Sequence, residues 1–249
     1  MQALAYQSRL EPLLMSILSA VDIHFEYPNK PLFVQTSLQV EAGQIVGILG
    51  PNGAGKTTFF DIVCGLKKIS GGLLTHSFTQ QLYLSQTVMT PPALRMFDIF
   101  RMTELLCSTT PLKKQHVLDK LSHWSPPMLQ RYNEIWDKKS SLCSYGEKRW
   151  FFTVSLLALS AELIILDEPT AGVDPEFRFY IWECLRGAAQ EGAAILVSSH
   201  NVEEISENCN GFYMISQKQF IHFDDGDSFK KRYQADSLDH AFIKAAAAI

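Results

Sequence analysis

The segment Gly50-Pro51-Asn52-Gly53-Ala54-Gly55-Lys56-Thr57-Thr58 decides the fold of this 249-residue chain. It follows the apolar run 45–49 and leads into residues 58–64, which can form a helix that ends before Gly65. The pattern G-x-x-x-x-G-K-[ST] between a strand and a helix is that of a phosphate-binding loop. Its glycines let consecutive backbone N–H groups face an anion, Lys56 reaches the outer phosphates of a nucleotide, and the Thr57 hydroxyl binds Mg²⁺. The alternative is an ordinary glycine-rich turn with an exposed lysine.

A second segment, residues 161–169, supports the phosphate-binding interpretation. Its apolar run Leu163-Ile164-Ile165-Leu166 suits a central parallel strand that is buried on both faces. Asp167 and Glu168 follow at the carboxyl end of this strand, where ligands collect in open α/β sheets. We predict that Asp167 binds Mg²⁺ through water and that Glu168 orients or deprotonates the attacking water. A strand end solvated by two acids is the alternative.

Between these two segments lies Ser144-Tyr145-Gly146-Glu147, directly before the apolar helical stretch 148–157. The N-terminus of such a helix offers a second anion site, with the Ser144 hydroxyl and the Gly146 N–H at its mouth. The alternative is a plain helix cap with a glutamate in the first turn. In this order and spacing, the three segments resemble the motifs of the nucleotide-binding subunit of an ATP-binding-cassette (ABC) transporter, and residues 144–147 resemble its signature loop.

The resemblance covers about residues 16–242 and implies roles for four further residues. Tyr27 matches the aromatic residue that stacks on adenine, and Gln86 matches the glutamine that serves catalysis and Mg²⁺ binding. Asp174 matches the aspartate of the loop after the catalytic glutamate, and His200 matches the histidine that senses the γ-phosphate. Tyr27 and His200 could each be an ordinary core residue instead. The resemblance also implies that the signature residues act in trans, on ATP bound by a second subunit.

The sequence departs from the family pattern at the signature loop. Tyr145 replaces the first glycine of the family's signature, and Glu147 stands where glutamine is common. The stretch from Ser70 to Gln86 is also shorter than usual. Gln80 and Gln81 are the fallback candidates for the role assigned to Gln86, although they precede the strand rather than follow it.

The composition excludes several classes of function. The net charge of −4 and the lack of a long basic run argue against a nucleic-acid partner. The five cysteines are scattered without a C-x-x-C pattern, which is typical of reduced thiols in the cytosol. The histidines other than His200 show no metal-ligand spacing.

The pattern along the chain predicts an α/β fold with three parts. A P-loop NTPase core with a mostly parallel sheet is assigned to residues 16–86 and 148–235, and an antiparallel β subdomain is expected within residues 16–47. Residues 87–147 lose strand character and are predicted to form an inserted α-helical subdomain, with breaks at Pro91-Pro92 and Pro126-Pro127. Residues 1–15 are interpreted as an N-terminal extension. The domain is expected to end at residue 242, and 243–249 form a C-terminal tail.

These motifs predict an ATPase that uses ATP and Mg²⁺. The resemblance implies a peripheral subunit at the cytoplasmic side of the inner or plasma membrane, which pairs with a second ABC subunit and powers a separate membrane permease, with export favoured. The rivals are a soluble ABC ATPase that is not involved in transport and a module that senses ATP without hydrolysing it. We expect the permease to dock near Gln86, in a groove that Leu94, Met96, Phe97 and Phe100 can line. The alternative is that these side chains form the insertion's own core.

Overall fold

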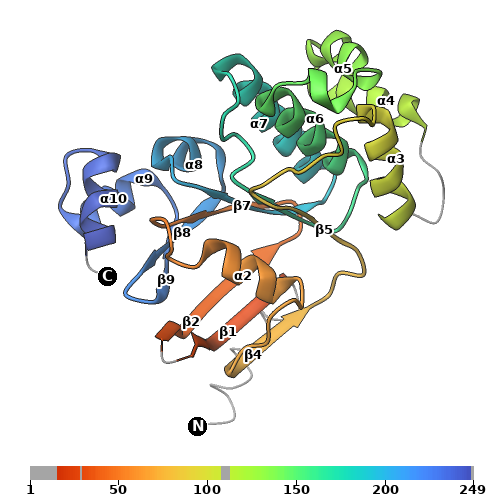
Figure 1. Cartoon of the computed structure of the whole chain (residues 1–249). Coiled ribbons are helices and arrows are strands. Elements are labelled where there is room, and N and C mark those ends of the chain that lie inside the picture. Colours follow the sequence, from red (N-terminus) through yellow and green to blue (C-terminus); the bar gives the residue numbers. More distant parts are fainter. Residues whose placement is uncertain (1–15, 29, 108–112, 248–249) are drawn as a thin grey trace.

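The computed structural model describes residues 16–28, 30–107 and 113–247, which form two sheets and the helices around them (Figure 1). The strands are β1 (Ser16–Tyr27), β2 (Lys30–Glu41), β3 (Ile45–Leu49), β4 (Gly71–His76), β5 (Gln81–Leu84), β6 (Leu163–Asp167), β7 (Ala194–Ser199), β8 (Gly211–Ser216) and β9 (Gln219–Phe223). The helices are α2 (Lys56–Val63), α3 (Met96–Cys107), α4 (Lys114–Trp124), α5 (Met128–Trp136), the short 3₁₀ helix η2 (Ser140–Leu142), α6 (Tyr145–Ala158), α7 (Pro175–Gln190), α8 (Val202–Asn208), α9 (Gly226–Tyr233) and α10 (Leu238–Ala247).

The first sheet is a three-stranded antiparallel sheet with the order β2-β1-β4. Strand β2 alternates buried and exposed residues over most of its length, because one face packs on the core and the other faces solvent. The antiparallel strands predicted for residues 16–47 are thereby confirmed for β1 and β2. The sheet lies on one side of the molecule, next to α2 (Figure 1).

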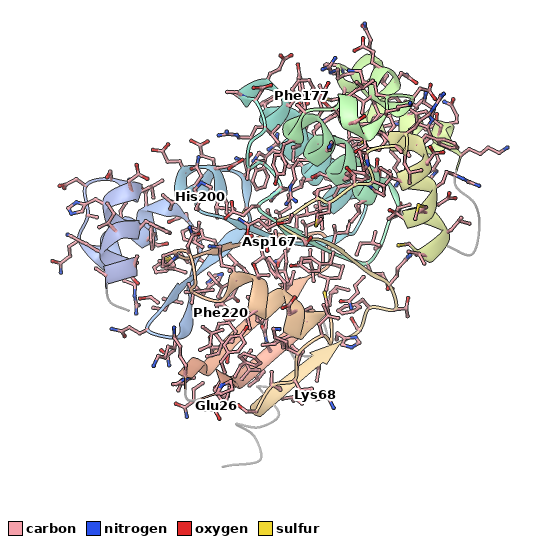
Figure 2. All side chains as sticks on the ribbon, in the orientation of Figure 1. Glu26, Lys68, Asp167, Phe177, His200 and Phe220 are labelled. Carbon is pink, nitrogen blue, oxygen red and sulfur yellow. The ribbon has the colours of Figure 1, made fainter. Side chains whose placement is uncertain are left out.

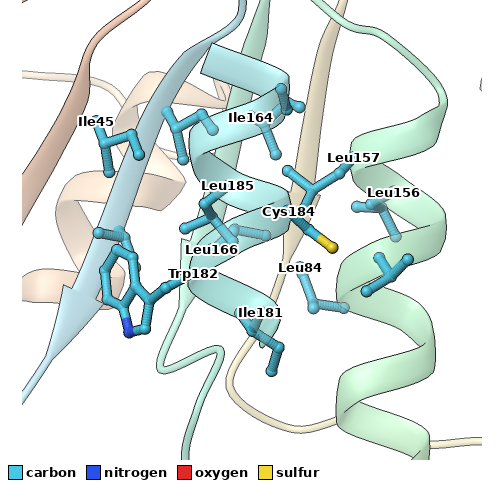
Figure 3. Close-up of a cluster of buried hydrophobic side chains, with 14 of the residues drawn as sticks. Ile45, Leu84, Leu156, Leu157, Ile164, Leu166, Ile181, Trp182, Cys184 and Leu185 are labelled. Carbon is cyan, nitrogen blue, oxygen red and sulfur yellow. The ribbon is translucent and has the colours of Figure 1, made fainter. Parts of the chain in front are cut away.

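The second sheet has six strands in the order β5-β6-β7-β3-β8-β9, all parallel except the antiparallel edge strand β9. Every residue of β3, β6 and β7 is buried. Alternate residues of β6 enter different cores: Ile164 and Leu166 contact α6 and α7, whereas Leu163 and Ile165 belong to the core beneath α2 and β1–β2. Burial on both faces explains the continuous apolar run that the sequence showed. Figure 3 shows the first of these cores, with Cys184 and Leu185 of α7 facing the sheet.

The predicted helical insertion is confirmed and consists of α3, α4, α5 and η2, from Met96 to Leu142. Pro127 immediately precedes α5, in agreement with the predicted break. An aromatic cluster of Phe100, Tyr132, Trp136 and Phe151 joins the insertion to α6. Because α6 starts at Tyr145, the signature residues begin the helix that connects the insertion to the core.

The C-terminal end of the described chain forms α9 and α10, which pack beside α8 (Figure 1). Helix α10 runs past residue 242, where the sequence analysis ended the domain. Ala245 is fully buried, and its carbonyl accepts a hydrogen bond of 2.7 Å from Ser216 Oγ. Residues 243–247 are therefore part of the packed domain. The proposed extension 1–15 lies outside the described residues.

Candidate active site

The phosphate-binding loop connects β3 to α2 and has the backbone that its glycines allow. Gly53 and Gly55 have φ angles of 82° and 108°, in the left-handed region that side chains rarely adopt. A Cβ on Gly55 would lie 2.9 Å from both Leu32 Cδ2 and Phe33 Cζ, so glycine is also required by packing against β2. The loop therefore reaches the start of α2 with its backbone free to approach a phosphate group.

Lys56 begins α2 and is almost completely buried. Its Nζ donates a hydrogen bond of 2.6 Å to the Gly50 carbonyl, so the lysine folds back over the loop. Burial lowers the pKa of Lys56, and the negative charges of Glu168 and Asp167 oppose this shift. The lysine is thus held beside the two carboxylates, where it can balance added phosphate charge.

Asp167 ends β6 and contacts α2 and β7 through its carboxylate. Thr57 Oγ1 donates to Asp167 Oδ2 at 2.7 Å, and Ser198 Oγ donates to Oδ1. A hydroxyl and a carboxylate are hard oxygen ligands of the kind that Mg²⁺ prefers. Because Thr57 and Asp167 already lie within hydrogen-bonding distance, and Gln86 lines the same cavity, these residues fit an Mg²⁺ ion.

Glu168 follows in a left-handed conformation, with a φ angle of 55°. This conformation costs about 1–3 kcal/mol for a residue other than glycine, and it clusters at functional sites. The Glu168 N–H is held by Ser198, through its hydroxyl at 3.0 Å and its carbonyl at 3.2 Å. The nearly buried carboxylate accepts a hydrogen bond from His200 Nδ1 at 2.9 Å. Ser198 of β7 therefore orients the backbone of Glu168, and His200, directly after β7, orients its side chain.

A cavity of about 480 Å³ collects these residues at the carboxyl end of the sheet. Asp167 lies near the middle of the molecule, between Phe177 on the α7 side and Phe220 beside the antiparallel strands (Figure 2). The lining residues are Tyr27, Lys30, Leu32, Pro51, Asn52, Gly53, Gly55, Lys56, Thr57, Thr58, Gln86, Asp167 and Glu168. The structure thus brings Tyr27 and Gln86 to the phosphate-binding loop and the carboxylates, although they lie far apart in sequence.

Tyr27 stands at the rim of this cavity, with 41% of its surface exposed. Its hydroxyl lies 3.1 Å from Thr58 Oγ1, and its ring packs edge-on against Phe25. A half-exposed ring that is anchored at both ends can present a flat apolar face to a base.

The signature residues line a different cavity. Ser144 caps α6 in a capping box: its Oγ accepts from the Glu147 N–H at 3.1 Å, and Glu147 Oε2 accepts from the Ser144 N–H at 2.8 Å. Ser144, Gly146 and Glu147 line a cavity of about 270 Å³ together with Asp174 at the start of α7. The helix-cap interpretation is therefore correct for the geometry, and the signature does not line the cavity of its own chain's phosphate-binding loop.

The side chains that we expected to line a docking groove do not line one, and other residues form the groove next to Gln86. Met96 is fully buried, Phe100 is buried, and Phe97 packs against Trp136 at a ring distance of 5.3 Å, so these side chains belong to the insertion's own core and the prediction was wrong for them. A groove of about 390 Å³ does lie next to Gln86, between β5 and α3. Its lining includes Val88, Met89, Ile99, Thr103 and Phe152.

Two residues of the site escaped the sequence reasoning. Ser198 joins Asp167 to Glu168, and Arg149 is a fully buried cation that bonds to the backbone on either side of the site. A signal for Arg149 was present in the sequence, since it directly precedes the apolar run 150–152 of α6. Nothing in the sequence pattern distinguished Ser198 from other serines at the end of a strand.

Comparisons with known proteins agree with this geometry. The sequence model of the ABC transporter family matches residues 33–171, and that of an AAA domain (putative AbiEii toxin, Type IV TA system) matches residues 138–206. Protein McbF of Escherichia coli is 30% identical over 217 residues, which are 85% of this chain and 87% of that protein. The lipopolysaccharide export system ATP-binding protein LptB of Haemophilus influenzae is 30% identical over 223 residues, which are 83% of this chain and 90% of that protein.

Solved structures show the same fold. An ATP-binding subunit of an ABC transporter superposes with a TM-score of 0.77 at 21% identity, covering 92% of this chain and 99% of that chain. An inward-facing putative metal-chelate type ABC transporter gives a TM-score of 0.74 at 20% identity, covering 92% and 89%. Since the family model spans more than half of the sequence and the site carries the nucleotide-binding geometry, the chain belongs to the ABC transporter family, as an ATP-binding subunit with an ATPase domain.

Proposed function

We propose that two copies of this subunit, or this subunit and a similar one, close over two ATP molecules and hydrolyse them to drive a membrane permease. The observation that carries the proposal is the hydrogen bond between His200 and Glu168, because Glu168 lines the same cavity as Lys56, Thr57 and Asp167. In this arrangement a carboxylate, an orienting imidazole and a phosphate-binding loop meet at one sheet edge.

The proposed reaction is attack of water on the γ-phosphate. Glu168 accepts the proton of the water and is oriented for this role by His200 and Ser198. Lys56 binds the outer phosphates, and the loop N–H groups bind the rest of the phosphate chain. Bound Mg²⁺ would neutralise phosphate charge, and Thr57, Asp167 and Gln86 would hold it. Tyr27 stacks on the adenine.

The trans action of the signature loop is part of the proposal. The Ser144 hydroxyl and the N-terminus of α6 lie in a cavity separate from the chain's own ATP site, which supports a role toward ATP bound by a partner subunit. Asp174 begins α7 in the same cavity, where it can contact the partner. Each nucleotide would then lie between two chains, and its binding would favour closure.

The transport partner is proposed from the family and from the groove beside Gln86. No helix in the described part of the chain is long and apolar enough to cross a membrane. From the family, we place this subunit at the cytoplasmic side of the membrane, bound to a permease that inserts a short segment into the groove lined by Val88, Met89 and Ile99. Export is the direction favoured, because the similar LptB proteins are named as parts of a lipopolysaccharide export system.

Replacement of Glu168 by glutamine tests the proposal. Glu168→Gln should bind ATP as wild type does, while turnover falls by roughly 10²–10⁴-fold, because the amide cannot accept the water's proton. The closed dimer should accumulate with Mg-ATP and double the mass measured by light scattering. Glu176→Gln, the same change at an exposed position in the first turn of α7, is the matched control. Wild-type turnover in Glu168→Gln would refute the assignment of the base.

A further inference from the structure

The main-chain carbonyl of Gln86 accepts hydrogen bonds from two side chains of α6, the helix that begins with the signature residues. Tyr145 Oη donates to the Gln86 carbonyl oxygen at 3.0 Å, and Arg149 Nη1 donates to the same oxygen at 3.2 Å. Tyr145 and Arg149 are four residues apart, so they lie on one face of α6. The first turns of α6 therefore bind the loop that carries Gln86 into the ATP site.

Arg149 extends this link to the catalytic carboxylates. Its guanidinium is fully buried and also donates to the carbonyls of Ser85 and Asp167. A buried cation is stable only where several acceptors surround it, and these three carbonyls supply them at the ends of β5 and β6. Burial lowers the pKa of Arg149, and the charges of nearby acidic groups, Asp167 and Glu168 among them, oppose the shift. Arg149 thus fixes the spacing between Gln86 and Asp167.

Tyr145 lies between two loops of the active site. Its ring packs on Gly172, where a Cβ would come within 3.0 Å of Tyr145 Cδ1. The neighbouring Gly146 approaches the same loop so closely that a Cβ there would lie 2.7 Å from the Gly172 carbonyl oxygen. One side of the tyrosine thus contacts the loop after Glu168, and its hydroxyl reaches the loop of Gln86. A glycine at position 145, as in the family's usual signature, could make neither contact.

We propose that Tyr145 is a positioning residue that acts through Gln86 and ties the signature loop to the Mg²⁺ side of its own ATP site. The phenol hydrogen bond, with that of Arg149, fixes the orientation of the peptide after Gln86 and so directs the Gln86 side chain toward Asp167. Movement of Gln86 on nucleotide binding is then transmitted to the helix that faces the partner subunit. The inference rests on the role proposed above for Gln86.

The test removes only the hydroxyl. In Tyr145→Phe the ring remains on Gly172, and the loss of one half-exposed hydrogen bond should lower kcat by roughly two- to tenfold. The Mg²⁺ concentration for half-maximal turnover should rise, while the Kd of ATP measured without Mg²⁺ stays unchanged. A merely structural role would not change the Mg²⁺ dependence. Tyr213→Phe is the matched control, because it also removes a hydrogen bond between a phenol and the backbone, here accepted by Tyr213 Oη from the Gln39 N–H of β2, and neither residue lines the ATP cavity.

A double-mutant cycle with Gln86→Ala identifies the path of the effect. If Tyr145 acts through Gln86, Tyr145→Phe should have no further effect on kcat or on Mg²⁺ dependence in the Gln86→Ala background. If the losses of kcat in the two single variants added in the double variant, the inference would be overturned. It would also be overturned if Tyr145→Phe behaved as wild type while Gln86→Ala was impaired. If Gln86→Ala itself turned over normally, the proposed role of Gln86 would fail and the inference with it. Circular dichroism melting of each variant separates these results from misfolding.

Discussion

His200 Nδ1 lies 2.9 Å from Glu168 Oε2, although 32 residues separate the two side chains in sequence. The carboxylate is almost buried, whereas the imidazole is largely exposed at the edge of the cavity. His200 therefore reaches from solvent to hold the group that is proposed to activate water. Its other ring nitrogen, Nε2, can donate to a γ-phosphate when the imidazole carries a proton on both nitrogens.

This contact predicts the behaviour of His200→Ala. Without the imidazole, Glu168 loses its side-chain hydrogen bond and the γ-phosphate loses a donor, so we expect turnover to fall by roughly 10²-fold. Binding of ATP should change little, because Lys56 and the loop remain. Steady-state kinetics with equilibrium ATP titration would check both expectations. A strong loss of ATP affinity with unchanged kcat would show instead that His200 serves binding.

Mixed dimers test action in trans. The test needs a negative charge in the signature loop that does not disturb its own chain. Gly146 cannot carry it, because a side chain there would collide with the Gly172 carbonyl of the same chain. Ser144→Asp retains the helix cap, since aspartate caps as well as serine, and places a negative charge toward the partner's γ-phosphate. Ser144→Asn is its neutral control.

The expected pattern is complementation. Ser144→Asp alone and Lys56→Ala alone should each be nearly inactive, whereas a mixture should recover turnover, because one composite site in the mixed dimer is intact. Ser144→Asn should retain most of its activity. A mixture as inactive as either parent would argue against pairing of this chain with itself.

The docking groove predicts a selective loss of membrane binding. Met89 is 88% exposed and lines the groove beside Gln86, so Met89→Glu should place an unpaired charge in the docking surface and release the subunit from permease-containing membranes. Leu66→Glu is the control, since Leu66 is 70% exposed and lies after α2, outside the groove. Both variants should bind ATP normally in a filter or fluorescence assay. Retention of Met89→Glu on the membranes would place the docking surface elsewhere.

A stability prediction concerns the contact between α7 and α4. Alanine favours a helix over glycine by about 1 kcal/mol, so propensity predicts that Gly187→Ala stabilises α7. A Cβ at Gly187 would, however, lie 2.2 Å from Cδ1 of Trp124. Trp124 cannot move freely, because its Nε1 donates to Glu191 at 2.8 Å. We expect overpacking to prevail and the free energy of unfolding to fall by about 1–2 kcal/mol.

Urea denaturation would measure this change, and the Trp124→Ala background, which removes Cγ as well as the ring, would identify its cause. With the indole removed, Gly187→Ala should become neutral or stabilising, because only the propensity term remains. A loss of stability that persists without Trp124 would point to another source of strain.

The local sequence pattern was sufficient to predict much of the fold. The run 163–166 predicted a strand buried on both faces, because parallel strands between two helical or sheet layers need apolar side chains on each side. The phosphate-binding loop could be recognised because its chemistry depends on backbone conformation at consecutive positions, which fixes residue type and spacing. The insertion was predicted from the loss of alternation after Gln86.

The docking surface and the C-terminal boundary could not be found in the same way. An apolar residue on a helix is equally suited to a groove and to a core, and only the packing of α3 against α5 and α6 showed that Met96 and Phe100 are buried. Likewise, the short alanine-rich end of α10 has no marked pattern, and its burial depends on the contact between Ala245 and Ser216.

The sequence by itself determined the candidate residues for the nucleotide chemistry, because motif spacing along the chain is set by the local geometry of strand, loop and helix. Only the tertiary structure decided which of them meet. The ends of β5, β6 and β7 come together through hydrogen bonding between strands, and this brings Gln86, Asp167 and His200 to one edge of the sheet. The links made by Arg149 and Tyr145 depend on how α6 packs against that edge, a relationship between distant segments that no local pattern encodes.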